Sequence, residues 1–207
     1  AEGTYDNCTI SVTDNISNNT SDNLSVSSFT IDTTAPTLDN VTIASNNSES
    51  TLAKTGDNIT LSITSAEAIQ TPSVSIAGQT ATVTGSGTSW SAAYTMAGSD
   101  SEGPVSLNIV FSDLAGNPGG AIDNTPDGSA VQFDRTSPVL QPVDNVTTPT
   151  SDNTSLSYTF SSTEAGTINY SVCSGSLDNA SADNNTTTFD ALADGTHSNC
   201  KISVTDN

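Results

Sequence analysis

Few side chains in this sequence could perform nucleophilic or acid–base catalysis. The single histidine, His197, lies in the turn DGTHSN, and a second copy of the same segment carries Tyr5 in its place. A general base that one copy lacks is a poor catalytic residue, so we interpret His197 as a solvated turn residue. Serine is abundant, but the sequence contains neither a GxSxG elbow nor a Ser-Lys arrangement. We therefore predict that the chain is not an enzyme.

The charge of the chain is strongly one-sided. Asp and Glu number 23 against three Lys and Arg, which gives a formal net charge of −20. Because phosphate binding requires clustered basic side chains, this composition excludes a nucleic-acid-binding surface. It also disfavours docking on an anionic membrane. No apolar run approaches the roughly 20 residues of a spanning helix, so we expect no direct membrane insertion.

An internal repeat is the most specific signal in the sequence. Residues 3–15 (GTYDNCTISVTDN) and residues 195–207 (GTHSNCKISVTDN) are identical at ten of 13 positions, at an offset of 192 residues. Self-similarity at a fixed offset indicates an array of repeated units. Cys8 and Cys200 are therefore the same position in two copies.

The elements that carry these residues are predicted to be short strands. Apolar residues alternate with Ser and Thr, as in Ile59-Leu61-Ile63, and no stretch shows a helical period. The alternation of Trp90 with Tyr94 and Met96 predicts that Trp90 belongs to the core. Many short strands with one apolar face each indicate an all-β fold of sandwiches. In the central part we expect strands at Leu38–Ile43, Ile59–Thr64, Ser73–Ile76, Thr80–Val83, Trp90–Met96, Val105–Ser112 and Ala130–Phe133.

Two proline-containing linkers divide the chain. They are FTIDTTAPTL at 29–38 and QFDRTSPVL at 132–140. We expect a complete sandwich domain at 33–136 between them. Residues 1–32 are expected to be the C-terminal strands of a preceding, incomplete domain. Residues 137–207 are expected to form a second domain that lacks its last strands, so the fragment is out of phase with its domains.

Several segments resemble a known family. SFTIDTTAPTL, LAKTGDNITLSITSAEAIQTPSVSIAGQTATV, FSDLAGN and QFDRTSPVL are similar to the bacterial Ig-like repeat domains of giant surface adhesins and extracellular fibre proteins. The second domain, with SYTFSSTEAGTINYSVC and DGTHSNCKISVTDN, is similar to a companion repeat of such proteins. The resemblance covers essentially the whole chain. It implies tandem immunoglobulin-like β-sandwich domains in a rod, located at the cell surface or secreted.

In an Ig-like domain the cysteines have a structural use. Cys173 would end one strand and Cys200, 27 residues later, would begin an adjacent antiparallel strand, so a disulfide between them is geometrically reasonable. Cys173 is out of phase with Tyr170 and must follow a bulge or the strand end. Cys8 would pair with a cysteine upstream of the fragment. The alternative is that these thiols are free and buried.

The Ig-like topology also brings acidic residues together at the end of each domain where the chain enters. Oxygen ligands that converge there suit Ca²⁺, which takes six to eight oxygens, and related adhesin repeats often carry calcium at domain junctions. The alternative is that these acids cap turns and keep the surface soluble. The predicted ligand sets are Asp32, Glu67 and Asp113 for the first domain and Asp134, Glu164 and Asp206 for the second.

Asparagine occurs in an unusual context. Fourteen of the 20 Asn residues begin an N-x-Ser/Thr sequon, and none of these lies between Ile59 and Asp144. Glycosylation of a surface filament would fit, although Asn- and Thr-rich strands also favour the triplet. The glycosylation candidates are Asn15, Asn19, Asn23, Asn40, Asn58, Asn145, Asn153, Asn169, Asn179 and Asn185.

Together these patterns favour a structural repeat unit of an extracellular adhesin stalk or cell-surface fibre, which gives length and stiffness. Its expected partners are neighbouring repeats of the same protein and further copies in a self-assembled fibre. The main alternative is a ligand- or glycan-binding Ig-like module of a surface protein. An accessory domain of an exported hydrolase is a third. Repetition favours the stalk, because a recognition site is usually unique.

Overall fold

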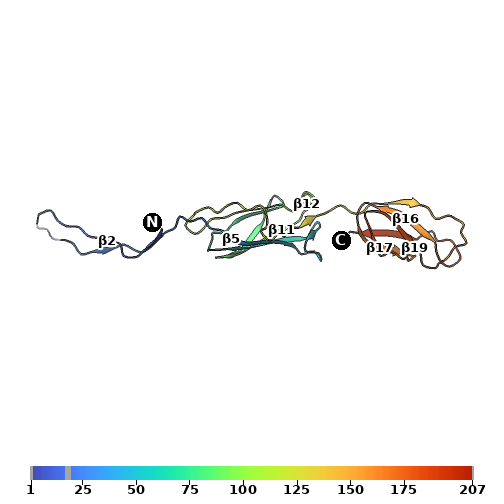
Figure 1. Cartoon of the computed structure of the whole chain (residues 1–207), viewed down its shortest axis with the longest axis horizontal. Helices are drawn as coiled ribbons and strands as arrows, with labels where there is room; N and C mark the ends of the chain where they lie inside the picture. Colours follow the sequence, from blue (N-terminus) through green and yellow to red (C-terminus); the bar gives the residue numbers. More distant parts are fainter. Residues whose placement is uncertain (1, 17–19, 207) are drawn as a thin grey trace. The chain divides into compact units, whose positions relative to one another are not determined.

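The computed structural model describes residues 2–16 and 20–206, and within them the fold is all-β. It contains short strands in several small, mainly antiparallel sheets, and the described residues form no helix (Figure 1). The chain divides into two compact units, Ala1–Asp134 and Arg135–Asn207. This division lies two residues before the boundary expected at 136, and the first unit includes residues 1–32. No helix that could span a membrane occurs among the described residues.

Between Leu38 and Phe133 the first unit contains three sheets. Alternating apolar residues form long strands in the central four-stranded sheet, where all neighbours are antiparallel. Its order is β10 (Thr82–Ser86), β11 (Ser89–Thr95), β7 (Asn58–Ser65) and β5 (Leu38–Ser45). One three-stranded sheet has the order β13 (Leu107–Val110), β8 (Ser73–Ile76) and β9 (Gln79–Thr80). The other has the order β12 (Gly103–Pro104), β14 (Gln132–Phe133) and β6 (Leu52–Ala53).

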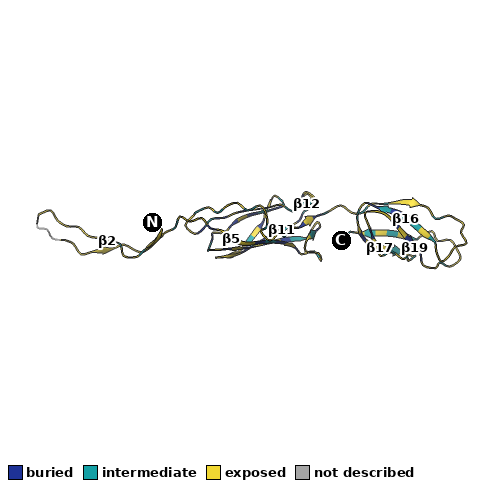
Figure 2. Ribbon diagram, viewed as in Figure 1, coloured by how far each residue is buried: buried dark blue, intermediate teal, exposed yellow. Residues whose placement is uncertain are grey.

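One apolar core joins these sheets. In β7, Ile59, Leu61 and Ile63 are fully buried, and the residues between them are exposed, as a period of two requires. Figure 2 colours the chain by burial. Trp90 belongs to the same core, and its indole Nε1 donates a hydrogen bond of 3.1 Å to the carbonyl of Gly87. The predicted burial of Trp90 is thus confirmed. Buried side chains from separate sheets meet in this core, which is compatible with a β-sandwich.

The described residues before Asp32 form a narrow two-stranded ribbon. In this N-terminal ribbon, β1 (Gly3–Tyr5) pairs with β4 (Phe29–Ile31), and β2 (Thr9–Ile10) pairs with β3 (Leu24–Ser25), both antiparallel. Its large apolar side chains are poorly covered, since Leu24 is 68% and Phe29 is 45% exposed. The ribbon therefore has paired backbone but no core of its own.

The second unit consists of two three-stranded antiparallel sheets. The first has the order β15 (Leu140–Asp144), β16 (Ser157–Ser162) and β19 (Asp183–Thr188). The second has the order β18 (Asn179–Ala180), β17 (Gly166–Ser171) and β20 (Lys201–Thr205). Its buried apolar core is small and centres on Phe160, Ile168 and Ala180. Gly166 is required where β17 meets β20, because a Cβ there would lie 2.3 Å from the carbonyl oxygen of Thr205.

Candidate calcium site and disulfide

The first predicted ligand set converges in the structure. Asp32, Glu67 and Asp113 each offer a carboxylate oxygen, and these three oxygens lie within 4.8 Å of one another. They come from three separate segments, namely the linker after β4, the turn after β7 and the turn after β13. Asp113 is buried, and the other two acids are half-buried.

A tight turn holds the carboxylate of Asp113. The backbone N–H groups of Gly116 and Asn117 donate to its Oδ1 at 2.6 and 2.8 Å, and the side-chain amide of Asn117 donates to its Oδ2 at 2.7 Å. Gly116 closes this turn with φ +97°, a conformation that favours glycine. Burial alone raises the pKa of Asp113, but the hydrogen bonds from Asn117, Gly116 and Ala115 together bring this pKa below its ordinary value. The carboxylate is therefore ionised at neutral pH.

Asn117 also fixes the linker. Its Nδ2 donates a second hydrogen bond, of 3.1 Å, to the backbone carbonyl of Asp32. One amide thus holds both the buried carboxylate and the chain segment that carries the first acid. The sequence places Asn117 in the same loop as Asp113, within the segment FSDLAGN, but the predicted ligand set contains only the acids.

Glu67 is positioned by a serine at the end of β7. The hydroxyl of Ser65 donates a 2.5 Å hydrogen bond to the backbone carbonyl of Glu67, and Ser65 itself is buried. The same construction occurs in the second unit, where the hydroxyl of Ser162 donates to the carbonyl of Glu164 at 2.6 Å. Sequence reasoning missed both serines. The shared spacing in SAE and STE could have identified them.

The two units also share the register around these turns. Leu38 pairs with Ser65 at one end of β5, and Leu140 pairs with Ser162 at the same end of β15. In each unit the residue after that serine donates its N–H to the residue before that leucine, at 3.0 Å in the first unit and 3.1 Å in the second. The first strand of each unit also contains a register shift, between Leu38 and Asn40 in β5 and between Pro142 and Asp144 in β15.

The second predicted ligand set lies only partly within one unit. Glu164 and Asp206 belong to the second unit, where their carboxylate oxygens lie within 4.8 Å of each other and both side chains are half-buried. Asp134 is the last residue of the first unit. The second unit thus provides two of the three predicted acids itself.

The first set fits the size of a calcium ion. Ca²⁺ binds oxygens at about 2.3–2.6 Å, so two oxygens that share one ion lie at most about 5 Å apart. The three oxygens of Asp32, Glu67 and Asp113 meet this limit. Carboxylates can bind through one or both oxygens, and water completes the six to eight ligands. Repulsion between three close acids also favours a divalent cation over none.

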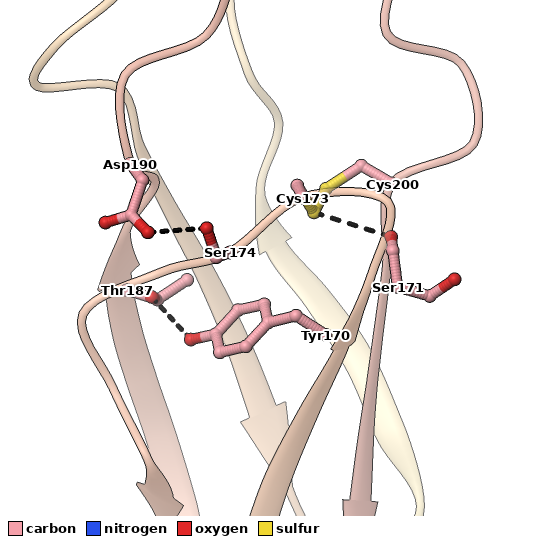
Figure 3. Close-up of a disulfide and its surroundings, with 7 residues drawn as sticks. All are labelled: Tyr170, Ser171, Cys173, Ser174, Thr187, Asp190 and Cys200. Carbon is pink, nitrogen blue, oxygen red and sulfur yellow. Dashed lines mark hydrogen bonds between the residues drawn. A yellow bond between two sulfur atoms is a disulfide. The ribbon is translucent and has the colours of Figure 1, made fainter.

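The structure joins Cys173 and Cys200 in a disulfide, with a Cα–Cα distance of 5.3 Å (Figure 3). Strands β17 and β20 are antiparallel neighbours, and both cysteines lie just outside them. The expected strand end before Cys173 is present, because β17 ends at Ser171 and Val172 has φ +74°. Cys8 is half-buried and has no disulfide partner in the described part of the chain.

The predicted glycosylation sites differ in accessibility. Asn58 is half-buried, and Asn19 lies outside the described residues. Asn185 must be corrected, because it is only 5% exposed and its side-chain amide donates to the carbonyls of Ser181 and Asp183, both at 2.9 Å. Its nitrogen is therefore not available in the folded chain. The exposed candidates are Asn15, Asn23, Asn40, Asn145, Asn153, Asn169 and Asn179.

His197 is exposed, and its Nε2 lies 2.8 Å from the carbonyl oxygen of Ala193.

Comparison with known proteins gives no further assignment, since no protein-family model and no curated protein matches this chain. The resemblance to bacterial Ig-like repeats rests on the sequence segments quoted above.

Proposed function

We propose that this chain is a structural repeat unit of an extracellular adhesin stalk or cell-surface fibre, built from tandem Ig-like β-sandwich domains in a rod. The observation that carries the proposal is the shared construction of the two units. Leu38, Ser65 and Glu67 correspond to Leu140, Ser162 and Glu164 in pairing and hydrogen bonding. A series of similar domains provides length and stiffness, whereas a recognition site needs only one copy.

The sequence repeat supports the same function. Ten of 13 residues recur after 192 positions, and a segment of the form D-x-T-x-P precedes both β5 and β15, beginning at Asp32 and at Asp134. Neighbouring repeats of the same protein are then the main partners of the chain. The net charge of −20 keeps such filaments apart unless cations screen the repulsion.

Calcium has a structural role in this proposal. An ion held by Asp32, Glu67 and Asp113 would neutralise three carboxylates and tie the linker to two turns of the first unit. Asn117 already connects the same linker and turn, so the ion would stiffen a preformed arrangement. The disulfide between Cys173 and Cys200 is typical of an oxidising, extracytoplasmic location, which supports the cell surface.

Small-angle scattering with calcium and with chelator tests the stalk directly. A stiff repeat has a larger maximum dimension and less flexibility with calcium, and chelation loosens it without unfolding either unit. The glycan- or ligand-binding alternative is tested on a glycan array and with immobilised surface proteins. Specific, saturable binding to one of these ligands, with scattering curves unaffected by calcium, would favour the alternative.

A further inference from the structure

The outer face of the four-stranded sheet in the first unit carries only small, uncharged side chains. In β7, Thr60, Ser62 and Thr64 are exposed and alternate with the buried core residues. The strand register places outward residues of β5, β11 and β10 beside them, so that twelve residues form three rows. We call these twelve residues the hydroxyl face, because nine of them are Ser or Thr. From β5 to β10 the rows are Asn40, Thr64, Ser89 and Ser86; Thr42, Ser62, Ser91 and Thr84; and Ala44, Thr60, Ala93 and Thr82.

The negative charge of this unit lies mostly in its turns. Between Leu38 and Phe133 nine residues are Asp or Glu, and eight of them lie outside the strands. The exception is Asp39, at the register shift of β5 beside one corner of the hydroxyl face. Because like charges repel most strongly at close range, two copies of a chain with a net charge of −20 can approach most closely through a face that lacks acids.

The chemistry of the hydroxyl face is self-complementary. A Ser or Thr hydroxyl both donates and accepts hydrogen bonds, so a face of hydroxyls can bond to a copy of itself. An acidic surface cannot do so, because ionised carboxylates only accept. The face contains no aromatic side chain, whereas small-molecule sites are lined mainly by hydrophobic and aromatic residues. Its composition therefore favours a second copy over a sugar or another small ligand.

The second unit has a similar face on the corresponding sheet. Strands β15 and β16 correspond to β5 and β7 in register, and β16 also pairs with β19. The hydroxyls of Thr159 and Thr186 lie 2.9 Å apart across this pair. Strand β15 adds one acid, Asp144, opposite Thr159. The outward pairs of β16 and β19 are Ser157 with Thr188, Thr159 with Thr186, and Ser161 with Asn184.

We propose that the hydroxyl face of the first unit packs against the same face of a second copy of this chain. The contact is isologous, since the same residues of both copies meet around a two-fold axis. Small side chains let the two sheets approach closely. The methyl groups of Thr and Ala then leave water, and the hydroxyls exchange water for one another. All four strands lie between Leu38 and Thr95, far from both ends of the sequence.

The size of the face makes each contact weak. Four strands about 4.8 Å apart, with three rows about 6.7 Å apart, cover roughly 400 Å² per copy. The two copies together bury about 800 Å², which is less than the roughly 1,200 Å² of a stable, specific interface. Repeats that lie side by side in two stalks would add such contacts, because each bound pair raises the effective concentration of the next. The strength in a fibre therefore rests on the proposed stalk function, whereas the contact itself does not.

Clustering of beads that carry the full chain at high density tests the contact. Chelator removes divalent ions, and sodium chloride is raised stepwise to screen the repulsion between acids. The chain is produced without glycosylation, because Asn40 begins a sequon within the face. We expect the beads to cluster. Ser62→Glu, in the middle row, should abolish clustering, and Ser73→Glu, which adds the same charge at an exposed residue of β8, should leave it unchanged.

Cross-linking locates the contact on the face. A chain with Ser62→Cys on a Cys8→Ser background is treated with a bifunctional maleimide, and Ser73→Cys on the same background is the control. We expect a covalent dimer from Ser62→Cys and little from Ser73→Cys. Equal melting temperatures of the paired variants show that neither substitution acts by unfolding the unit.

Several results would overturn the proposal. They are beads that do not cluster at any ionic strength, equal clustering of the Ser62→Glu and Ser73→Glu chains, and equal cross-linking of the two cysteine variants. Glycan-coated beads test the other occupant. If they bind the unmodified chain but not Ser62→Glu, while beads of the chain alone stay separate, the face is a glycan site instead. A flexible chain in scattering would contradict the stalk function and leave the bead result unchanged.

Discussion

The hydroxyl of Tyr170 lies 2.7 Å from the hydroxyl of Thr187 (Figure 3). Tyr170 also donates a 2.9 Å hydrogen bond to the backbone carbonyl of Leu177. Tyr170 is in β17 and Thr187 is in β19, which belong to different sheets of the second unit. Thr187 is fully buried. Because Tyr170 uses its proton toward Leu177, Thr187 is the donor between the two hydroxyls. A polar contact thus connects two sheets that share only a small apolar core.

We predict that Tyr170→Phe lowers the free energy of unfolding of the second unit by about 1–3 kcal/mol. The substitution leaves the buried hydroxyl of Thr187 and the carbonyl of Leu177 without their partner, and unmade buried hydrogen bonds cost about that much. Denaturant unfolding measures the effect. Tyr158→Phe is the matched control, since Tyr158 is a half-buried ring of the same core. Equal losses in the two variants would mean that packing, and not the hydrogen bonds, is responsible.

Reduction of the disulfide should destabilise the second unit alone. The bridge closes an interval of 27 residues, and its loss costs about 3–4 kcal/mol in the chain-entropy model. We expect Cys173→Ser with Cys200→Ser to lower the melting temperature of the second unit and to leave that of the first unit unchanged. Calorimetry of the full chain resolves the two transitions. A Cys8→Ser chain is the control, and reductant should lower its second transition in the same way.

The sequence predicted the fold best where strands are long and buried on one face. The alternation of Ile59, Leu61 and Ile63 placed β7 to within one residue at each end. Alternation could not predict β6 (Leu52–Ala53) or β12 (Gly103–Pro104), because a two-residue strand is too short to show a period. Both strands depend on pairing with β14, which is distant in the sequence.

The acidic site could be predicted only in part for a similar reason. Carboxylates at strand ends are visible in a sequence, so Glu67 and Asp113 were found. The hydrogen bonds that hold them are not visible, because Asn117 and Ser65 act through turn geometry. Burial is equally hidden in polar strands. Asn185 begins a sequon, yet its side-chain amide is buried and donates hydrogen bonds to the carbonyls of Ser181 and Asp183 in the turn between β18 and β19.

We predict that acid weakens the first unit partly through Asp127. Backbone and hydroxyl hydrogen bonds from Ser129 lower the pKa of Asp127 below its ordinary value of 3.8. A carboxylate whose pKa is lower in the folded state stabilises the fold above the unfolded pKa, and this stability is lost as pH falls through the folded pKa. The loss matters structurally, because the hydroxyl of Ser129 accepts a hydrogen bond from the N–H of Ile43 in β5.

Urea unfolding from neutral pH to well below 3.8 checks this prediction. Asp127→Asn should lower stability at neutral pH and flatten the decline in acid. Asp123→Asn removes one charge from the same segment and serves as the control. If Asp123→Asn flattens the acid decline as much as Asp127→Asn does, general charge repulsion and not the Ser129 hydrogen bonds explains the pH dependence.

Calcium should stabilise the first unit through Asp32, Glu67 and Asp113. An ion that binds only the folded state adds about 2.7 kcal/mol at a hundredfold excess over its Kd. We therefore expect calcium to raise the melting temperature of this unit and chelator to reverse the increase. Glu67→Gln should remove most of the effect, because the amide keeps the shape of the side chain but loses its charge. Glu49→Gln, at an exposed residue outside the site, is the control with the same loss of charge.

The same variants separate a bound ion from simple screening. Screening by dissolved cations acts on all exposed acids, so it would raise the melting temperatures of the Glu67→Gln and Glu49→Gln chains equally. Sodium at a higher concentration would then produce the same stabilisation as calcium. A specific ion discriminates between the two variants and between calcium and the smaller magnesium ion, which tolerates irregular oxygen geometry poorly. Identical melting curves in calcium and chelator would leave these three acids with only the turn-capping contacts that Asp32 and Asp113 already make.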